Sequence, residues 1–303
     1  MTAAIVLGAI LFGAFLAGVV MIGGVWWRQE RIAYQPPRET PAAPANVQRI
    51  DYRAADEQQL FGYAVEPEGT PHGVLIAFHG NADLAVWQIP WAREVARRSG
   101  WCVFLAEYRG YGSLDGEPSY RGVQADARAA WAAAVSLAAD LDADGCEFAL
   151  FGHSLGSGVA CELAAELLAR AKTSTPSPGD APAVLVLQSP FTSARDMARI
   201  VSTRPVQWLW RSISRVHYDT RQRFDVLDVP VWIAHGARDW LVPVTMGHEL
   251  FGRARHPGEL LIVDDANHND VAEAAGERYW TWITRALIRT HRGTQRSTID
   301  TPY

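Results

Sequence analysis

The sequence predicts an α/β domain with a mostly parallel central sheet and helices on both faces. Short apolar runs, of the kind that form buried parallel strands, alternate along the chain with longer helical runs. One apolar run, 146–151, leads through Gly152-His153-Ser154-Leu155-Gly156 into a helical run at 159–172. That succession of strand, tight turn and helix is typical of a nucleophile elbow, which exposes a serine hydroxyl at the edge of a parallel sheet.

The other predicted elements follow from the same periodicities. Residues 47–53 and 60–65 are expected to form an antiparallel hairpin that leads into the sheet. The apolar runs predict further strands at 73–78, 101–106, 147–151, 184–187, 231–234 and 260–263. The clearest helices, 123–141 and 271–289, carry Ala, Trp and Leu at helical spacing, which favours packing against the core. Together these elements define one domain over residues 47–290.

A stretch of about 190–228 interrupts the alternation and is expected to form a small helical cap. Its Trp208-Leu209-Trp210 cluster is more apolar than an exposed loop should be. These tryptophans either help to line an acyl pocket or attach the cap to the core, and the sequence leaves both readings open. The polar tail, 291–303, is expected to be disordered.

The N-terminus predicts a membrane anchor over residues 3–27, which carry no charge. At about 1.5 Å per residue, such a helix crosses a hydrocarbon core of about 30 Å. No Lys or Arg precedes the run, whereas a cleaved signal peptide normally begins with a basic region, so an uncleaved anchor is favoured. Residues 28–46, rich in Pro and Ala, are expected to form an extended linker. Arg28, Arg31 and Arg38 follow the anchor, which favours a cytoplasmic catalytic domain.

Composition excludes several classes of function. The net charge of -5, without a basic run, argues against nucleic acid as a partner. Lys172 is the sole lysine, which leaves almost no residue for a serine–lysine dyad or a Schiff base. The Cys and His spacings do not match metal sites, and no Gly-rich phosphate loop is present, so neither a metal nor a cofactor is implied.

Ser154 is the candidate nucleophile at the apex of the predicted elbow. Gly152 and Gly156 leave room for the strand and the helix to approach each other. The backbone N–H of Leu155, at the start of the following helix, is predicted to point toward a developing oxyanion. A serine is a weak nucleophile at neutral pH, so this one needs a base, and the base needs an orienting carboxylate.

Asp239 and His268 are the candidate acid and base, since each lies in the loop after a predicted strand. Asp239 follows the strand 231–234 through a Gly236-containing turn, and His268 follows the strand 260–263. The remaining downstream carboxylates are interpreted as loop acids, and His235, which ends a strand, as a hydrogen-bonded structural histidine. The alternatives to the two candidates are Asp225, Asp228, Asp264 and Asp265 for the acid and His235, His248, His256 and His291 for the base.

The second oxyanion donor is expected after the strand 73–78, where His79-Gly80-Asn81-Ala82 turns out of the sheet. Gly80 lets the backbone turn close to the reacting centre, and the backbone N–H of Asn81 can face the negative charge. Ala82 is a weaker candidate for the same donor. His79 is interpreted as structural.

This set of motifs, together with Tyr108-Arg109-Gly110-Tyr111-Gly112 and Ser189-Pro190-Phe191-Thr192-Ser193, resembles the α/β-hydrolase superfamily over about residues 47–290. It is most similar to the serine-aminopeptidase-like branch, which includes membrane-anchored α/β-hydrolase-domain proteins and relatives of protein depalmitoylases. In that branch an Asp often stands at the position of Glu107 and a Glu at that of Gln188. The resemblance implies the α/β-hydrolase fold and hydrolytic machinery, and it says little about the substrate.

The predicted function is therefore that of a membrane-anchored serine hydrolase acting on carboxylic esters or thioesters. The expected substrate is a small acylated or lipidic molecule or an acylated protein, because an anchor keeps the site near lipid. A peptidase or amidase is the alternative activity, since the same triad cleaves amides when the leaving amine is positioned for protonation. A catalytically silent hydrolase fold that serves as a binding module is the alternative from another class.

Overall fold

Within the residues that the computed structural model describes, 2–39, 41–141, 145–173, 179–201 and 214–297, eight strands form one sheet in the order β1-β2-β4-β3-β5-β6-β7-β8. The strands are β1 (Gln48–Arg53), β2 (Gln59–Val65), β3 (Gly73–Phe78), β4 (Cys102–Ala106), β5 (Glu147–His153), β6 (Val184–Gln188), β7 (Pro230–Gly236) and β8 (His256–Val263). The pairs β1–β2 and β2–β4 are antiparallel and the others are parallel. The predicted mostly parallel sheet is confirmed.

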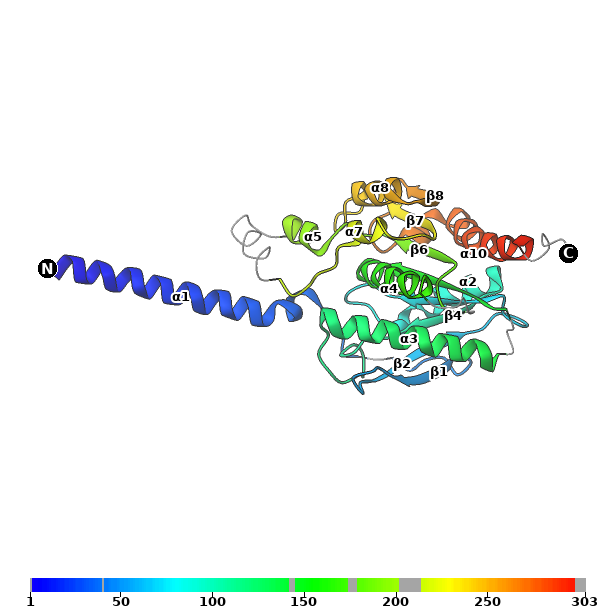
Figure 1. The fold of residues 1–303 in the computed structure, drawn as a ribbon, viewed down its shortest axis with the longest axis horizontal. Coiled ribbons are helices and arrows are strands. Elements are labelled where there is room, and N and C mark those ends of the chain that lie inside the picture. Colours follow the sequence, from blue (N-terminus) through cyan, green and yellow to red (C-terminus); the bar gives the residue numbers. More distant parts are fainter. Residues whose placement is uncertain (1, 40, 142–144, 174–178, 202–213, 298–303) are drawn as a thin grey trace.

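Helices cover both faces of this sheet (Figure 1). Their bounds are η1 (Ala85–Gln88), α2 (Ile89–Ser99), α3 (Tyr120–Asp140), α4 (Leu155–Ala171), α7 (Thr220–Phe224), α8 (Val244–Arg253), α9 (Val271–Ala275) and α10 (Glu277–Ser297). The helices α3, α4, α7 and α8 follow one another across one face, while α2, α9 and α10 pack on the other. Every residue of β3, β4 and β6 is buried, as expected for strands covered on both sides.

Parallel pairing brings the carboxyl ends of the central strands to one edge of the sheet. In the register of β3 and β5, Phe78 lies opposite Gly152, so the two turns that follow these strands are neighbours. The strands β6, β7 and β8 continue the parallel order, and their carboxyl-terminal loops meet at the same edge. Ligands of open α/β sheets bind at this edge.

The helix α1 (Thr2–Ala33) projects from the domain (Figure 1), and its stretch Ile5–Arg31 is long and apolar enough to cross a membrane. Residues 28–33, predicted to begin an extended linker, instead continue the helix. Tyr34, which follows it, is only 2% exposed and belongs to the core of the domain. The segment after the apolar stretch is therefore part of the folded domain, because it has a buried side chain of its own.

The predicted cap is represented by α5 (Ala194–Val201) and α7, while residues 202–213, with the Trp208-Leu209-Trp210 cluster, lie outside the described residues. The predicted helix 271–289 is divided into α9 and α10 at Gly276, whose positive φ of 54° favours glycine. Residues 291–297, predicted to be disordered, continue α10 to Ser297, because the lone Gly293 does not stop the helix. Residues 298–303 lie outside the described residues.

Candidate active site

Ser154 occupies a sharp turn between β5 and α4. Its backbone has a φ of 51° and a ψ of -113°, a conformation that costs a side-chain-bearing residue about 1–3 kcal/mol. A Cβ on Gly152 would collide with the Gly156 carbonyl, and one on Gly156 would collide with the Phe78 carbonyl. The two glycines are thus required by close packing of the helix on β5 and β3, and this packing holds the strained serine in place.

The loops after β7 and β8 bring Asp239 and His268 to this serine. The His268 Nε2 atom lies 2.8 Å from Ser154 Oγ, and its Nδ1 atom lies 2.7 Å from Asp239 Oδ2. The imidazole is 5% exposed and the Asp239 residue 8%, while Ser154 is only partly buried. The three side chains therefore form one hydrogen-bonded chain whose serine end meets solvent.

Three hydrogen-bond donors and a second histidine surround the Asp239 carboxylate. Its Oδ1 atom accepts hydrogen bonds from the backbone N–H groups of Leu241 at 2.9 Å and Val242 at 2.7 Å. Its Oδ2 atom faces both His268 and His235, whose Nε2 lies 3.3 Å away. Burial opposes ionisation, but the hydrogen bonds from His235 and His268 outweigh it and hold the pKa of Asp239 well below its usual range. The carboxylate is therefore ionised and can keep a proton on His268 Nδ1.

The turn after β3 lies beside the nucleophile. A Cβ built on Gly80 would lie 3.1 Å from His153 Nδ1, a tight contact, and 3.6 Å from the Ser154 Cβ, so this turn lies directly against the elbow. In the part of the chain that the structure describes, the backbone N–H groups of Asn81, in the turn after β3, and of Leu155, the first residue of α4, donate no hydrogen bond. Ala82, the weaker candidate, is exposed and has a φ of 54°.

The chain is similar in sequence to proteins of several organisms. No family model matches the chain. An uncharacterized protein of Mycobacterium tuberculosis is 31% identical over 285 residues, which cover 90% of this chain and 92% of that protein. The Arabidopsis thaliana protein WAV2, described as α/β-hydrolase domain-containing, is 25% identical over 292 residues, covering 88% of this chain and 89% of that protein. The chain belongs to the α/β-hydrolase superfamily.

The esterase Pf2001 of Pyrococcus furiosus shares the fold of this α/β-hydrolase, with a TM-score of 0.64 and 18% sequence identity. The likeness covers 84% of this chain and 97% of the esterase. A lysophosphatidylserine lipase of Danio rerio is 28% identical over 201 residues, covering 60% of this chain and 47% of that protein.

His79 of this α/β-hydrolase supports the turn after β3. Its Nε2 lies 2.7 Å from the Glu107 carboxylate and its Nδ1 lies 2.8 Å from the Gly80 carbonyl oxygen. Burial disfavours the imidazolium, but Glu107 outweighs burial and raises the pKa of His79. The second Glu107 oxygen accepts the N–H of Ala85 at 3.1 Å. Glu107, which follows β4, thus ties the end of this strand to the turn after β3 and to η1.

Sequence reasoning missed two residues that contact the backbone of the candidate base. His153 Nε2 and Ser189 Oγ each lie 3.2 Å from the His268 carbonyl oxygen. Burial, together with the nearby His268, lowers the pKa of His153 to about 3, so its ring is neutral and can donate through Nε2. His235 was interpreted as structural, and it is indeed buried and bonded to the Val242 carbonyl oxygen at 2.9 Å, but it also faces Asp239. The positions of His153 and Ser189 inside quoted motifs were the available signal.

Apart from His235, the described alternative acids and bases lie away from Ser154. His256 pairs with Asp228 at 2.7 Å on the exposed surface. Asp264, Asp265 and His248 are exposed, and Asp225 lies near Arg253. The side chain of His291 lies outside the described side chains. Among the described residues, no cluster of three or more His, Cys, Asp or Glu could hold a metal ion.

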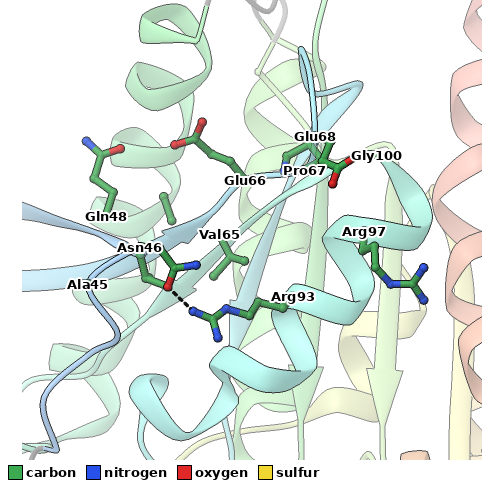
Figure 2. A pocket seen from close by; sticks show the side chains of 12 residues that line it. Ala45, Asn46, Gln48, Val65, Glu66, Pro67, Glu68, Arg93, Arg97 and Gly100 are labelled. Carbon is green, nitrogen blue, oxygen red and sulfur yellow. Dashed lines mark hydrogen bonds between the residues drawn. The ribbon is translucent and has the colours of Figure 1, made fainter.

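A separate surface hollow of about 830 Å³ lies between β2 and α2, and none of the residues of the candidate site lines it. Figure 2 shows Arg93 of α2 donating a hydrogen bond to Asn46 at its rim. Glu66 and Glu68 lie on the opposite side. The hollow is open and charged, unlike the apolar pockets in which ligands are usually enclosed.

Proposed function

We propose that this protein is a serine hydrolase that cleaves carboxylic ester or thioester bonds. The single observation that carries the proposal is the hydrogen-bonded chain Ser154–His268–Asp239 on a strained elbow. A serine hydroxyl is activated for acyl transfer by a histidine within hydrogen-bond distance and an ionised carboxylate behind that histidine. Here His268 Nε2 lies 2.8 Å from Ser154 Oγ. The Danio rerio relative, named a lysophosphatidylserine lipase, supports an ester substrate.

In the proposed reaction, Ser154 Oγ attacks the carbonyl carbon while His268 Nε2 accepts the hydroxyl proton. The carbonyl oxygen becomes an oxyanion that the backbone N–H groups of Asn81 and Leu155 stabilise. The tetrahedral intermediate then expels the alcohol or thiol, which takes the proton from His268, and leaves an acyl group on the serine. Water, deprotonated by the same imidazole, hydrolyses this acyl-enzyme and restores the free serine. Asp239 stabilises the imidazolium in both halves.

The same proposal includes membrane anchoring through α1, with the catalytic domain on the cytoplasmic face. It is supported by the apolar stretch Ile5–Arg31, whose described large apolar side chains are exposed, and by the arginines that follow the uncharged residues. An anchor of this kind keeps the hydrolase beside acylated or lipidic substrates. No nucleic-acid partner is proposed, given the net charge of -5.

The activity is tested with the full-length protein in detergent micelles. We expect turnover of p-nitrophenyl esters of graded acyl length, no turnover of p-nitroanilide peptides, and a fluorophosphonate adduct that peptide mass spectrometry maps to Ser154. Heat-unfolded protein, which lacks the hydrogen bond to His268, should not be labelled. Anilide turnover without ester turnover would instead indicate a peptidase or amidase. Absence of both turnover and an adduct would favour a binding module.

The orientation is tested with a topology reporter fused after Tyr303. Because of the arginines that follow the anchor, we expect activity from a reporter that works only in the cytoplasm and silence from one that works only outside it. The same reporters fused before Met1 serve as the control and should behave in the opposite way. Activity of the C-terminal fusion only outside the cytoplasm would contradict the proposed orientation.

A further inference from the structure

The segment that follows α1 makes specific contacts with the domain rather than passing beside it. The buried hydroxyl of Tyr34 lies 3.2 Å from that of Tyr218. Three residues further on, the Pro37 carbonyl oxygen accepts the N–H of Gly112 at 2.8 Å. In the last turns of α1 itself, the Gln29 side chain accepts the N–H of Arg215 at 2.7 Å. The chain between the proposed anchor and β1 is thus attached at several points near the carboxyl edge of the sheet.

The most informative of these attachments is made by the side chain of Asn81. Its Nδ2 donates to the Ala33 carbonyl oxygen at 2.8 Å, and its Oδ1 accepts the N–H of Gln35 at 2.9 Å. The same Oδ1 accepts the hydroxyl of Tyr111 at 2.7 Å. One amide group therefore joins the end of α1 to a tyrosine of the domain, and these partners lie 48, 46 and 30 residues away in the sequence.

The partner on the domain side is rigid. Tyr111 is fully buried, and its ring packs against those of Tyr108 and His79, with centroids 5.4 Å and 5.5 Å away. His79 is itself bonded to Glu107 and to the Gly80 carbonyl. The Asn81 amide is thus held between a fixed aromatic cluster and the backbone that leaves α1.

The orientation of Asn81 matters because its backbone N–H is the proposed oxyanion donor. The residue sits in the turn that carries Ala82, whose φ is 54°, and such connecting segments are more mobile than the strands and helices they join. An oxyanion donor is effective only if it is already aimed before the charge develops. The three side-chain hydrogen bonds supply that orientation, and two of them join Asn81 to Ala33, the last residue of α1, and to Gln35 just after it.

We infer that residues 33–35, together with the Asn81 side chain, form a positioning clasp for the oxyanion turn. The inference rests on the proposed function, since it concerns the same reaction. Asn81 has two parts in it: its backbone binds the oxyanion and its side chain positions that backbone. The end of the proposed anchor is therefore a component of the catalytic machinery as well as a tether.

The clasp is tested in the full-length protein in detergent micelles with p-nitrophenyl butyrate. Asn81→Ala keeps the backbone N–H but removes all three side-chain bonds. We expect kcat to fall about 10- to 100-fold, which is less than the roughly 10²- to 10³-fold cost of deleting a donor, with KM within about twofold. Tyr111→Phe, which removes one hydroxyl, should lower kcat in the same direction by a smaller factor.

The affinity for a trifluoromethyl ketone inhibitor distinguishes positioning of the oxyanion turn from a merely structural role, which would leave this affinity unchanged. Ser154 Oγ adds to the ketone carbon, its proton goes to His268, and the resulting oxyanion occupies the proposed hole. We expect the affinity for this ketone to weaken by the same factor as kcat/KM in each variant. Asn46→Ala is the matched control, because its side chain bonds Arg93 at the distant hollow (Figure 2) and its loss should leave both quantities unchanged.

Two results separate the inference from the proposed function. If Asn81→Ala and Tyr111→Phe lower the melting temperature but keep kcat and ketone affinity within about twofold of the wild type, the clasp has no positioning role. If Asn81→Ala does not fold, the result for Tyr111→Phe decides alone. If Ser154→Ala retains ester turnover, the proposed function itself fails, whatever the other variants do.

Discussion

Replacing Ser154 with Ala in the full-length protein is expected to lower kcat for p-nitrophenyl esters by about 10⁶-fold, the cost of removing the nucleophile of a Ser-His-Asp triad. The substitution removes the Oγ atom that lies 2.8 Å from His268 Nε2 and leaves no group that can form the acyl-enzyme. The fold should persist, because alanine is smaller than serine and the close packing at Gly152 and Gly156 is unchanged. Steady-state kinetics, fluorophosphonate labelling and a thermal melt measure the three consequences.

Ser136→Ala is the matched control for this variant. Ser136 is exposed on α3 and makes no contact with the candidate site, so its activity and labelling should equal those of the wild type. Residual turnover by Ser154→Ala above about one tenth of the wild-type rate would contradict the assignment of the nucleophile. A lost melting transition would show instead that the elbow serine is needed for folding.

Replacing Asp239 with Asn is expected to lower kcat by about 10⁴-fold through the wrong tautomer of the base. The N–H groups of Leu241 and Val242 would hold the amide oxygen, since both donate to Oδ1 in the native protein. The amide NH₂ would then face His268 Nδ1, where the native Oδ2 accepts. It would donate to Nδ1 and leave the proton on Nε2, so the imidazole could not accept the serine proton.

This effect is measured by kcat on the same esters, with Asp228→Asn as the matched control. Asp228 also pairs with a histidine, His256, at 2.7 Å, but the pair is exposed and outside the site. The control should therefore keep wild-type kcat. An Asp239→Asn variant that retains more than about one tenth of wild-type kcat would show that Asp239 does not select the tautomer.

Local patterns carried much of what could be predicted about the site. The elbow around Ser154 is encoded within a few residues, because the glycines at 152 and 156 and the flanking apolar runs specify strand, turn and helix together. Asp239 and His268 could be selected from rival residues because both follow predicted strands, and parallel strands end at one edge. The two now lie in one hydrogen-bonded chain with Ser154.

Contacts between distant segments could not be read in the same way. The buried hydroxyl of Tyr34 contacts that of Tyr218, which is 184 residues away. The Asn81 side chain bonds two residues of a segment that is predicted to be an extended linker. The sequence pattern indicates only a structural role for His235. The structure adds that the loop after β7 places Asp239 Oδ2 3.3 Å from its Nε2 atom. None of these contacts produces a pattern that can be recognised in the sequence.

The sequence by itself determined the α/β alternation, the elbow and the order of the candidate nucleophile, acid and base, because periodicity and turn chemistry are properties of neighbouring residues. Only the tertiary structure decided that the Asn81 side chain bonds the backbone at the end of α1 and that Asp239 faces two histidines. Such contacts depend on how separate elements pack, and packing brings together side chains whose separation along the chain carries no local signal.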